Sequence, residues 1–322
     1  MILAGDIGGT QTLLGLFDER PARPRPIAVR EYTTLEFADL CAMVARFAAE
    51  EDGGTITVQS ACFGVAGPVI GHEADLTNVP WHIDATTVGR MFNIPRVTLL
   101  NDLEALAYSV PVLHGDELHP LQPGEPLRGG NMALIAAGTG LGQALLHFVG
   151  GRFVPSASEA GHADWAARTD RDITLLRDLI ARYGRAEVEH VVSGRGLLNI
   201  HRTTHREAVC PVVDGLDAAE APAAITGAAL ERRCARCVET LEIFVDAYGA
   251  EAGNAALRGV STGGLFVGGG IAPKILPALT DGRFMAAFRA KGPLQDLLAN
   301  MPVQVILNPR AGLLGAAVFA SA

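Results

Sequence analysis

Residues 1–19, MILAGDIGGTQTLLGLFDE, contain two apolar segments separated by a short turn of Gly8, Gly9 and Thr10. Apolar runs interrupted by adjacent glycines predict a strand, a tight turn and a second strand. Adjacent glycines also let backbone N–H groups approach an anion closely, and Thr10 adds a hydroxyl. The turn is therefore a candidate phosphate-binding loop, with Asp6 placed to hold a metal-bound water. An ordinary hairpin turn is the alternative.

The same pattern returns in residues 131–151, where NMALIAA, GTGLG and QALLHFVGG again predict strand, glycine turn and strand. Two such units in one chain indicate a duplicated architecture that faces one ligand from two sides. This window has no Asp, Glu, Lys or Arg, but its glycines favour a hairpin over a membrane-spanning helix. Its turn, Gly138, Thr139 and Gly140, is the second candidate phosphate-binding loop.

Strands and helices alternate through the rest of the chain, which predicts an α/β sheet fold. Gly268, Gly269 and Gly270 follow a predicted strand but do not keep the spacing of a dinucleotide-binding fingerprint. They are better suited to a flat nucleotide ring lying against the backbone. Helical spacing is expected over residues 34–50 and 172–248, and further strands over residues 57–69 and 96–102. Residues 265–276 predict a strand, three glycines and a helix start, and residues 303–320 a strand, a turn and an apolar helix.

The composition describes a well-buried globular protein and limits its partners. Of 322 residues, 49% are hydrophobic and 19% charged, and the net charge of −9 comes with no Lys/Arg cluster. Nucleic acid and anionic membrane surfaces demand concentrated positive charge, so a small-molecule ligand is expected instead. Five cysteines without an even-spaced framework, and a start with no basic signal region, indicate reduced thiols and a cytoplasmic protein.

Residues 97–109, VTLLNDLEALAYS, lead a predicted strand directly into Asn101 and Asp102 and then into a helical pattern. One interpretation is that Asp102 caps the helix, because its side-chain oxygen can accept from a free backbone N–H. The other is that its carboxylate serves a ligand at the carboxyl end of the strand, where open α/β sheets bind them. The stretch alone leaves both open.

Other polar residues gather in two further motifs. Residues 156–165, SASEAGHADW, bring Glu159 and His162 together among small residues, and Glu189 begins EHVVSGRGL. One Glu and one His are too few ligands for a metal, so a pocket that hydrogen-bonds hydroxyls is the favoured hypothesis, with an ordinary polar surface loop as the alternative. Cys234 and Cys237 form a Cys-x-x-Cys on a predicted helix; a zinc site would need two more ligands, so buried thiols are expected and no metal site is predicted.

Eight motifs in order resemble the bacterial ATP-dependent glucokinase family from residue 3 to the end: GDIGGT, TNVPW, LLNDLEALA, AAGTGLG, SEAGHADW, EHVVSGRGL, GGLFVGGGIAPK and NPRAGLLGAA. The resemblance implies an actin-like, hexokinase-type (ribonuclease H-like) fold with two α/β domains around a cleft. It places a small domain at residues 1–111 plus 302–322 and a large one at 112–301, with breaks near Pro111 and Met301. Related sugar kinases and repressors that contain a zinc site carry a clustered Cys-x-Cys-Gly-x-x-Gly-Cys motif. That motif is absent from this sequence, so the resemblance is to the branch without zinc.

The resemblance also implies an activity, the ATP-dependent phosphorylation of D-glucose at its 6-hydroxyl, with Mg²⁺ and a homodimeric state. Alternatives are a kinase for another hexose such as mannose, a polyphosphate donor, or a non-catalytic sugar sensor. By matching the family motifs, Asp102 is expected to be the catalytic base. Sugar-binding residues are expected at Asn101, Asp102, Glu159, His162, Glu189 and, more weakly, Asn78, and nucleotide-binding residues at Asp6, Gly8, Gly9, Thr10, Gly138, Thr139, Gly140, Gly268, Gly269 and Gly270.

Overall fold

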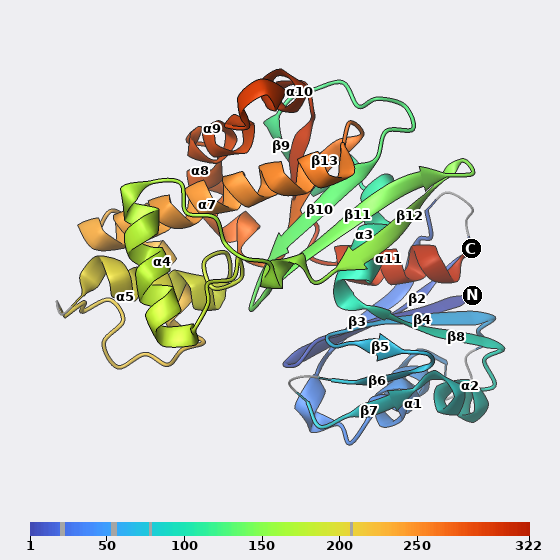
Figure 1. Ribbon diagram of the computed structural model, residues 1–322. Helices are drawn as coiled ribbons and strands as arrows, with labels where there is room; N and C mark the ends of the chain where they lie inside the picture. The colour runs from blue at the N-terminus through green and yellow to red at the C-terminus, as the bar shows by residue number, and fades with distance from the viewer. Residues whose placement is uncertain (20–22, 53–56, 77–78, 207–208) are drawn as a thin grey trace. The chain divides into compact units, whose positions relative to one another are not determined.

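The computed structural model describes residues 1–19, 23–52, 57–76, 79–206 and 209–322. The chain forms two compact units, of which unit 1 comprises Met1–Gly115 and Asn308–Ala322 and unit 2 comprises Asp116–Leu307. Both units combine a mixed β-sheet with helices, as Figure 1 shows. The α/β class predicted from the sequence is confirmed.

Unit 1 is built on a five-stranded sheet with the strand order β3-β2-β1-β4-β8. Strands β1 and β2 form the predicted antiparallel hairpin, and β4 and β8 extend the sheet parallel to β1. A second, three-stranded sheet has the order β5-β6-β7. The strands are β1 (Ile2–Ile7), β2 (Gln11–Phe17), β3 (Pro26–Thr33), β4 (Ser60–Val65), β5 (Val69–Ile70), β6 (Glu73–Asp75), β7 (His82–Asp84) and β8 (Arg96–Asn101).

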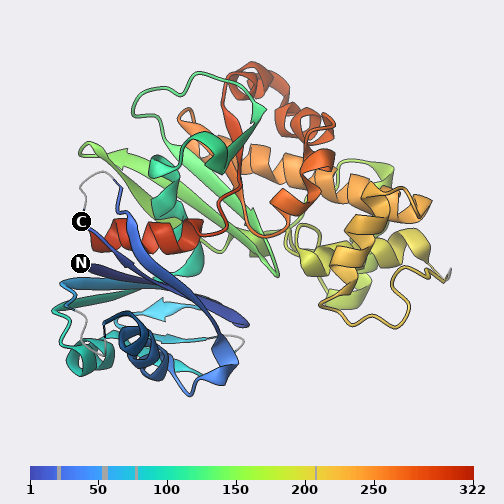
Figure 2. The same ribbon diagram turned by 180° about the vertical axis from the view of Figure 1, so that it is seen from behind.

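Helices cover both faces of the large sheet of unit 1, because successive side chains of a strand point to opposite faces. On β1, Leu3 and Ile7 pack into the core formed with α1 (Leu40–Asp52) and α2 (Ala85–Phe92). Ile2 and Ala4 pack instead against α3 (Asp102–Ser109) and α11 (Ala311–Ala320). The C-terminal helix α11 thus returns to the N-terminal sheet (Figures 1 and 2).

Unit 2 repeats the arrangement of unit 1. Its sheet has the order β12-β11-β10-β13-β14-β9, with an antiparallel β10–β11 hairpin and with β13 and β14 following β10 in parallel. The predicted duplication is therefore present in the topology as well as in the sequence pattern. The strands are β9 (Leu118–Gln122), β10 (Met132–Ala137), β11 (Leu141–Val149), β12 (Arg152–Ser158), β13 (Gly264–Gly268) and β14 (Val303–Ile306).

The helices of unit 2 surround one large apolar core, in which α7 packs along β10. Local sequence sets their ends: α4 begins with a Thr169–Asp172 capping box and ends at Gly184, whose φ of 79° suits glycine. No helix within the described residues is both long and apolar enough to cross a membrane. The helices are α4 (Asp170–Tyr183), α5 (Gly194–His205), α6 (Ala221–Leu230), α7 (Ala235–Gly259), α8 (Leu276–Leu279), α9 (Arg283–Arg289) and α10 (Gln295–Ala299).

The unit boundaries and one helix start differ by a few residues from those expected from the sequence. The compact units divide after Gly115 and after Leu307, a few residues beyond the expected breaks near Pro111 and Met301. β14 pairs with β13 and β9, which keeps residues up to Leu307 in unit 2. The helix predicted over residues 34–50 starts only at Leu40, after a 3₁₀ turn at Thr34–Glu36. Asp39 explains the later start, since its carboxylate accepts from the N–H of Ala42 at 2.7 Å.

Candidate active site

The first glycine turn follows β1 in unit 1 and is held by a buried threonine. The Thr34 hydroxyl donates to the carbonyl of Gly8 at 2.8 Å, and its backbone N–H donates to that of Thr10 at 2.9 Å. Inside the turn, the N–H of Gly8 donates to Gln11 at 3.0 Å. Thr34 is fully buried and has no local sequence signal linking it to the turn. These bonds fix the backbone of a loop suited to anion binding.

Asn101, and not Asp102, caps helix α3. The Asn101 side-chain oxygen accepts from the N–H of Leu103 at 3.0 Å, and its amide donates to the carbonyl of Gly67 at 3.2 Å. The capping role considered for Asp102 is therefore wrong, because α3 begins at Asp102 itself, one residue earlier than that assignment requires. Asp102 is the first residue of α3 and is exposed, with one oxygen accepting from Leu103 at 2.8 Å.

Asp6 lies close to Asp102 because β4 carries a glycine between them. Gly64 is in register with Asp6, and a Cβ there would lie 2.8 Å from the Cβ of Ala105 and 3.7 Å from the Cα of Asp102. Burial, and then the charge of Asp102, raises the pKa of Asp6 to about 6. Unit 1 thus gathers two carboxylates at the carboxyl ends of parallel strands, the usual ligand edge of such sheets.

The second glycine turn, in unit 2, is tied to α5 and to Glu189. The N–H of Gly138 donates to Gly140, and the carbonyl of Gly138 accepts from the N–H of Gly194, both at 2.9 Å. The Glu189 carboxylate accepts from the N–H of Leu141 at 2.8 Å, and a Cβ at Gly140 would lie 2.6 Å from it. Glu189 therefore both supports the turn and lies beside it.

The third glycine run packs against the strand that leads into the second turn. Gly268 ends β13 in register with Ala136 of β10, and the N–H of Ile271 donates to the carbonyl of Ala137 at 3.2 Å. Beneath both strands, the buried hydroxyl of Tyr248 is 3.3 Å from the N–H of Ala137 and 3.3 Å from the carbonyl of Gly268. Unit 2 therefore brings two of the predicted nucleotide-binding segments side by side.

Gly269→Ala is expected to lower the free energy of unfolding by at least about 2 kcal/mol. Gly269 has a φ of 82°, and a Cβ there would lie 2.3 Å from the carbonyl oxygen of Ala137, which is backbone and cannot rotate away. Urea unfolding measures the change. Gly270→Ala is the matched control, since a Cβ there meets nothing within 4 Å. Equal stability losses in the two variants would contradict the proposed packing.

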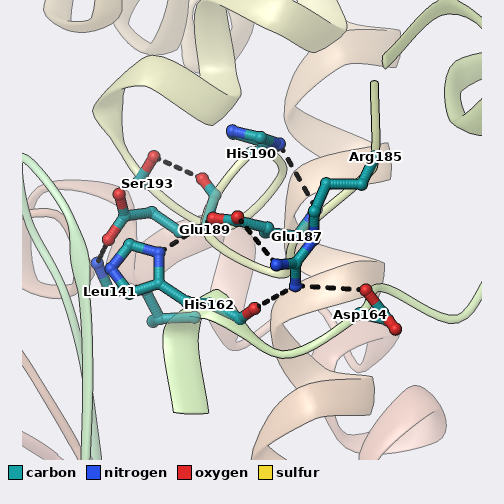
Figure 3. A network of polar contacts seen from close by, with 8 residues as sticks. All are labelled: Leu141, His162, Asp164, Arg185, Glu187, Glu189, His190 and Ser193. Carbon is teal, nitrogen blue, oxygen red and sulfur yellow. Dashed lines mark hydrogen bonds and ion pairs between the residues drawn. The ribbon is translucent and has the colours of Figure 1, made fainter. Parts of the chain in front are cut away.

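Figure 3 shows the polar contacts around two of the predicted residues in unit 2, His162 and Glu189. His162 Nδ1 is 2.8 Å from the Glu187 carboxylate, which also pairs with Arg185 at 3.6 Å. The N–H of Glu189 donates to the carbonyl of Gly161 at 2.8 Å, so its chain segment runs beside the Ala160–His162 turn (η4). Glu159 precedes that turn, and its backbone carbonyl accepts from the N–H of His162 at 3.0 Å.

The network favours the protonated form of His162. Its hydrogen bond to Glu187, followed by the charges of Glu189, Glu187 and Glu159, raises the pKa of His162 against the opposing effect of burial. The same hydrogen bond lowers the pKa of Glu187. An imidazole among three carboxylates can donate to one hydroxyl group while the acids accept from others, which is the chemistry of a sugar-binding pocket.

A sequence model of the glucokinase family matches residues 3–322. The chain belongs to the glucokinase family. The glucokinase of Synechocystis sp. is 40% identical over 345 residues, which cover 99% of this chain and 97% of that relative. Family membership makes the chain a sugar kinase, a phosphotransferase, and confirms the resemblance inferred from the eight motifs.

Solved structures of glucokinases share the fold. The crystal structure of glucokinase from an Antarctic psychrotroph has a TM-score of 0.86 at 29% identity, covering 99% of this chain and 98% of that one. A ROK family glucokinase from Streptomyces griseus, solved in complex with glucose and AMPPNP, has a TM-score of 0.64 at 22% identity, with 99% and 98% covered. The predicted actin-like, hexokinase-type two-domain fold is confirmed.

Within this glucokinase-family chain, the expected site residues fall into two groups. Unit 1 carries Asp6, the first glycine turn, Asn101 and Asp102, whereas unit 2 carries the other two glycine segments and the sugar-binding candidates Glu159, His162 and Glu189. Asn78 lies outside the described residues. Glu187 and Arg185 were not among the predicted site residues, although Glu187 stands only two residues before Glu189 and is also acidic.

Proposed function

We propose that this chain transfers the γ-phosphoryl group of ATP to the 6-hydroxyl of D-glucose, giving glucose 6-phosphate and ADP. The observation that carries the proposal is the exposed carboxylate of Asp102 at the carboxyl end of β8, beside Asp6, in a chain of the glucokinase family. The glucose and AMPPNP bound to the Streptomyces griseus glucokinase support the choice of both substrates.

Asp102 acts as the general base in this proposal. As the sugar oxygen attacks the γ-phosphorus, the Asp102 carboxylate accepts the hydroxyl proton, while ADP leaves on the opposite side of the phosphorus. Its place at the start of α3 suits this role, because Asn101 performs the capping and leaves the Asp102 carboxylate at an exposed position. Asn101 fixes the junction between β8 and α3 through its bonds to Leu103 and Gly67. We also propose that its side chain contacts the sugar.

The sugar is held by Glu159, His162 and Glu189. Because Glu187 occupies Nδ1 of His162, the imidazole presents Nε2 to a sugar hydroxyl, with its ring orientation fixed by the Glu187 hydrogen bond. Glu159 and Glu189 accept from neighbouring hydroxyls. Positioning of this kind lowers a barrier by up to about 7 kcal/mol in favourable cases.

The phosphates are bound by backbone N–H groups of the Gly8–Thr10 and Gly138–Gly140 turns, with Gly268–Gly270 beside the adenosine. Mg²⁺, when bound, neutralises phosphate charge in such reactions. The chain fits the ion: Asp6 offers hard oxygen ligands next to the first turn, and its carboxylate lies so close to α11 that a Cβ on Gly312 would be 2.5 Å from it. Asp6 is proposed to hold the ion through a bound water.

A coupled assay of ATP consumption with a panel of hexoses tests the proposal. Glucose-dependent turnover with stoichiometric glucose 6-phosphate is the expected result. Turnover with mannose but not glucose, or with polyphosphate but not ATP, would replace the substrate assignment. Glucose binding without turnover would favour a sugar sensor over a kinase. The family resemblance also supports a homodimer, which light scattering on the same sample can test.

A further inference from the structure

A cluster of buried imidazoles and thiols lies in unit 2, among residues that the proposed reaction does not use. His201 and His205 are four residues apart near the end of α5, Cys210 follows that helix, and Cys237 lies in the first turn of α7. One ligand atom from each of the four side chains lies within 4.8 Å of every other. Their exposed fractions are only 6%, 4%, 6% and 0%.

The sulfur spacing fits a tetrahedral metal site. Zinc binds sulfur at about 2.3 Å and imidazole nitrogen at about 2.0–2.1 Å, so the edges of its tetrahedron measure about 3.3–3.8 Å. The sulfur atoms of Cys210 and Cys237 are 3.9 Å apart. That distance is far beyond the roughly 2.05 Å of a disulfide, and both thiols are free.

The histidine nitrogens are arranged as in a metal site. Nε2 of His201 is buried, and within the described part of the chain it has no hydrogen-bond partner. Nδ1 of His205 lies 3.0 Å from the carbonyl of His201, which fixes the ring and makes Nε2, now in contact with the Cys234 sulfur, the nitrogen that would bind a metal. A buried ring nitrogen without a partner costs free energy, and a metal ion would remove that cost.

We propose that His201, His205, Cys210 and Cys237 bind a structural zinc ion. Binding releases the two thiol protons to solvent, and the two thiolates then balance the charge of Zn²⁺, so the buried site is neutral overall. The ion links the end of α5 to the start of α7. Because the start of α5 follows directly from the Glu189–Ser193 segment, the zinc would anchor the opposite end of the helix that adjoins the sugar-binding loop.

A path for the ion is present. His201, His205 and Cys210 line a hollow of about 340 Å³ at the surface of unit 2, together with Leu198 and Ala221. Cys237 closes the inner side of the cluster. The ligands are therefore buried yet reachable, as a site that loads after folding requires.

The sequence alone predicted no zinc site, because Cys234 and Cys237 supply only two ligands. The structure pairs Cys237 with residues from two other segments and leaves Cys234 outside the group of four. Cys234 is instead 3.5 Å from Nε2 of His205. The proposed ligands, two histidines and two cysteines from separate segments, therefore differ from the clustered cysteines of the related zinc-containing sugar kinases.

Metal analysis of the full chain, purified under reducing conditions and rinsed with a weak chelator, tests the proposal. About one equivalent of zinc per chain is expected. After removal of the zinc, addition of Co²⁺ should give the visible bands of tetrahedral thiolate coordination, a readout that needs no variant. His201→Gln and Cys210→Ser should each weaken Zn²⁺ binding by more than about 100-fold, because even changes outside the ligand set cost about 10–100-fold.

Two cysteine variants serve as controls. Cys41→Ser in unit 1 should keep the full zinc content, and so should Cys234→Ser, whose sulfur is outside the four. A native chain that takes up no zinc and gives no thiolate bands with Co²⁺ would overturn the proposal. Unchanged Zn²⁺ affinity in both His201→Gln and Cys210→Ser, or loss of zinc only in Cys234→Ser, would overturn this ligand set.

Discussion

Replacing Asp102 with Asn is expected to lower kcat by about 10²–10⁴-fold while glucose still binds. Asn has nearly the same shape but cannot accept the hydroxyl proton, so the attacking oxygen loses its base. The helix should survive the change, because Asn101 supplies the cap and remains in place. Coupled kinetics give kcat, and calorimetric titration with glucose gives the binding constant separately.

Glu104→Gln is the matched control for this variant. Glu104 lies two residues further along α3 and has no assigned role in the site. Its replacement by Gln removes the same negative charge as Asp102→Asn. Its kcat should stay within about twofold of the native value, as for substitutions away from special features. A similar fall in both variants would show that the charge of α3 matters and would remove the case for Asp102 as the base.

The parts of the fold that depend on local pattern were predictable. Apolar segments separated by adjacent glycines located both hairpins, because the backbone of a strand and that of a tight turn each favour particular residue types. The N-cap of α3 was harder to predict, since Asn and Asp are equally good caps and only the exact first residue of α3 decides between them. The late break after Leu307 likewise depends on the pairing of β14 with distant strands.

The supporting residues of the site were beyond sequence analysis for a different reason. Thr34 reaches the Gly8–Thr10 turn across more than twenty residues, and nothing near Thr34 marks it as a partner of that turn. The proposed zinc ligands could be predicted in part. The spacing of His201 and His205 places both on one face of a helix, a visible signal, but their convergence with Cys210 and Cys237 depends on how α5 packs against α7.

Asp6→Asn is expected to stabilise the protein at pH 7 while lowering kcat by about 10²-fold or more, the scale for removing one group that stabilises transition-state charge. Burial and the Asp102 charge raise the pKa of Asp6 from 3.8 to about 6, which corresponds to a penalty of about 3 kcal/mol for the ionised native form. The gain in the free energy of unfolding at pH 7 should therefore be up to about 3 kcal/mol.

The pH dependence of that gain separates it from a simple packing effect. Because the folded-state pKa is raised, the native chain binds more protons than the unfolded chain between pH 3.8 and about 6, and native stability falls as pH rises through this window. The advantage of Asp6→Asn should thus be complete above pH 6 and vanish below pH 3.8, measured by urea unfolding without metal or nucleotide. Asp84→Asn is the contrasting control: hydrogen bonds from Thr87 and Thr86 lower the pKa of Asp84, so that variant should gain no stability at pH 7. A gain for Asp6→Asn that persisted unchanged at low pH would show that ionisation of Asp6 is not the cause.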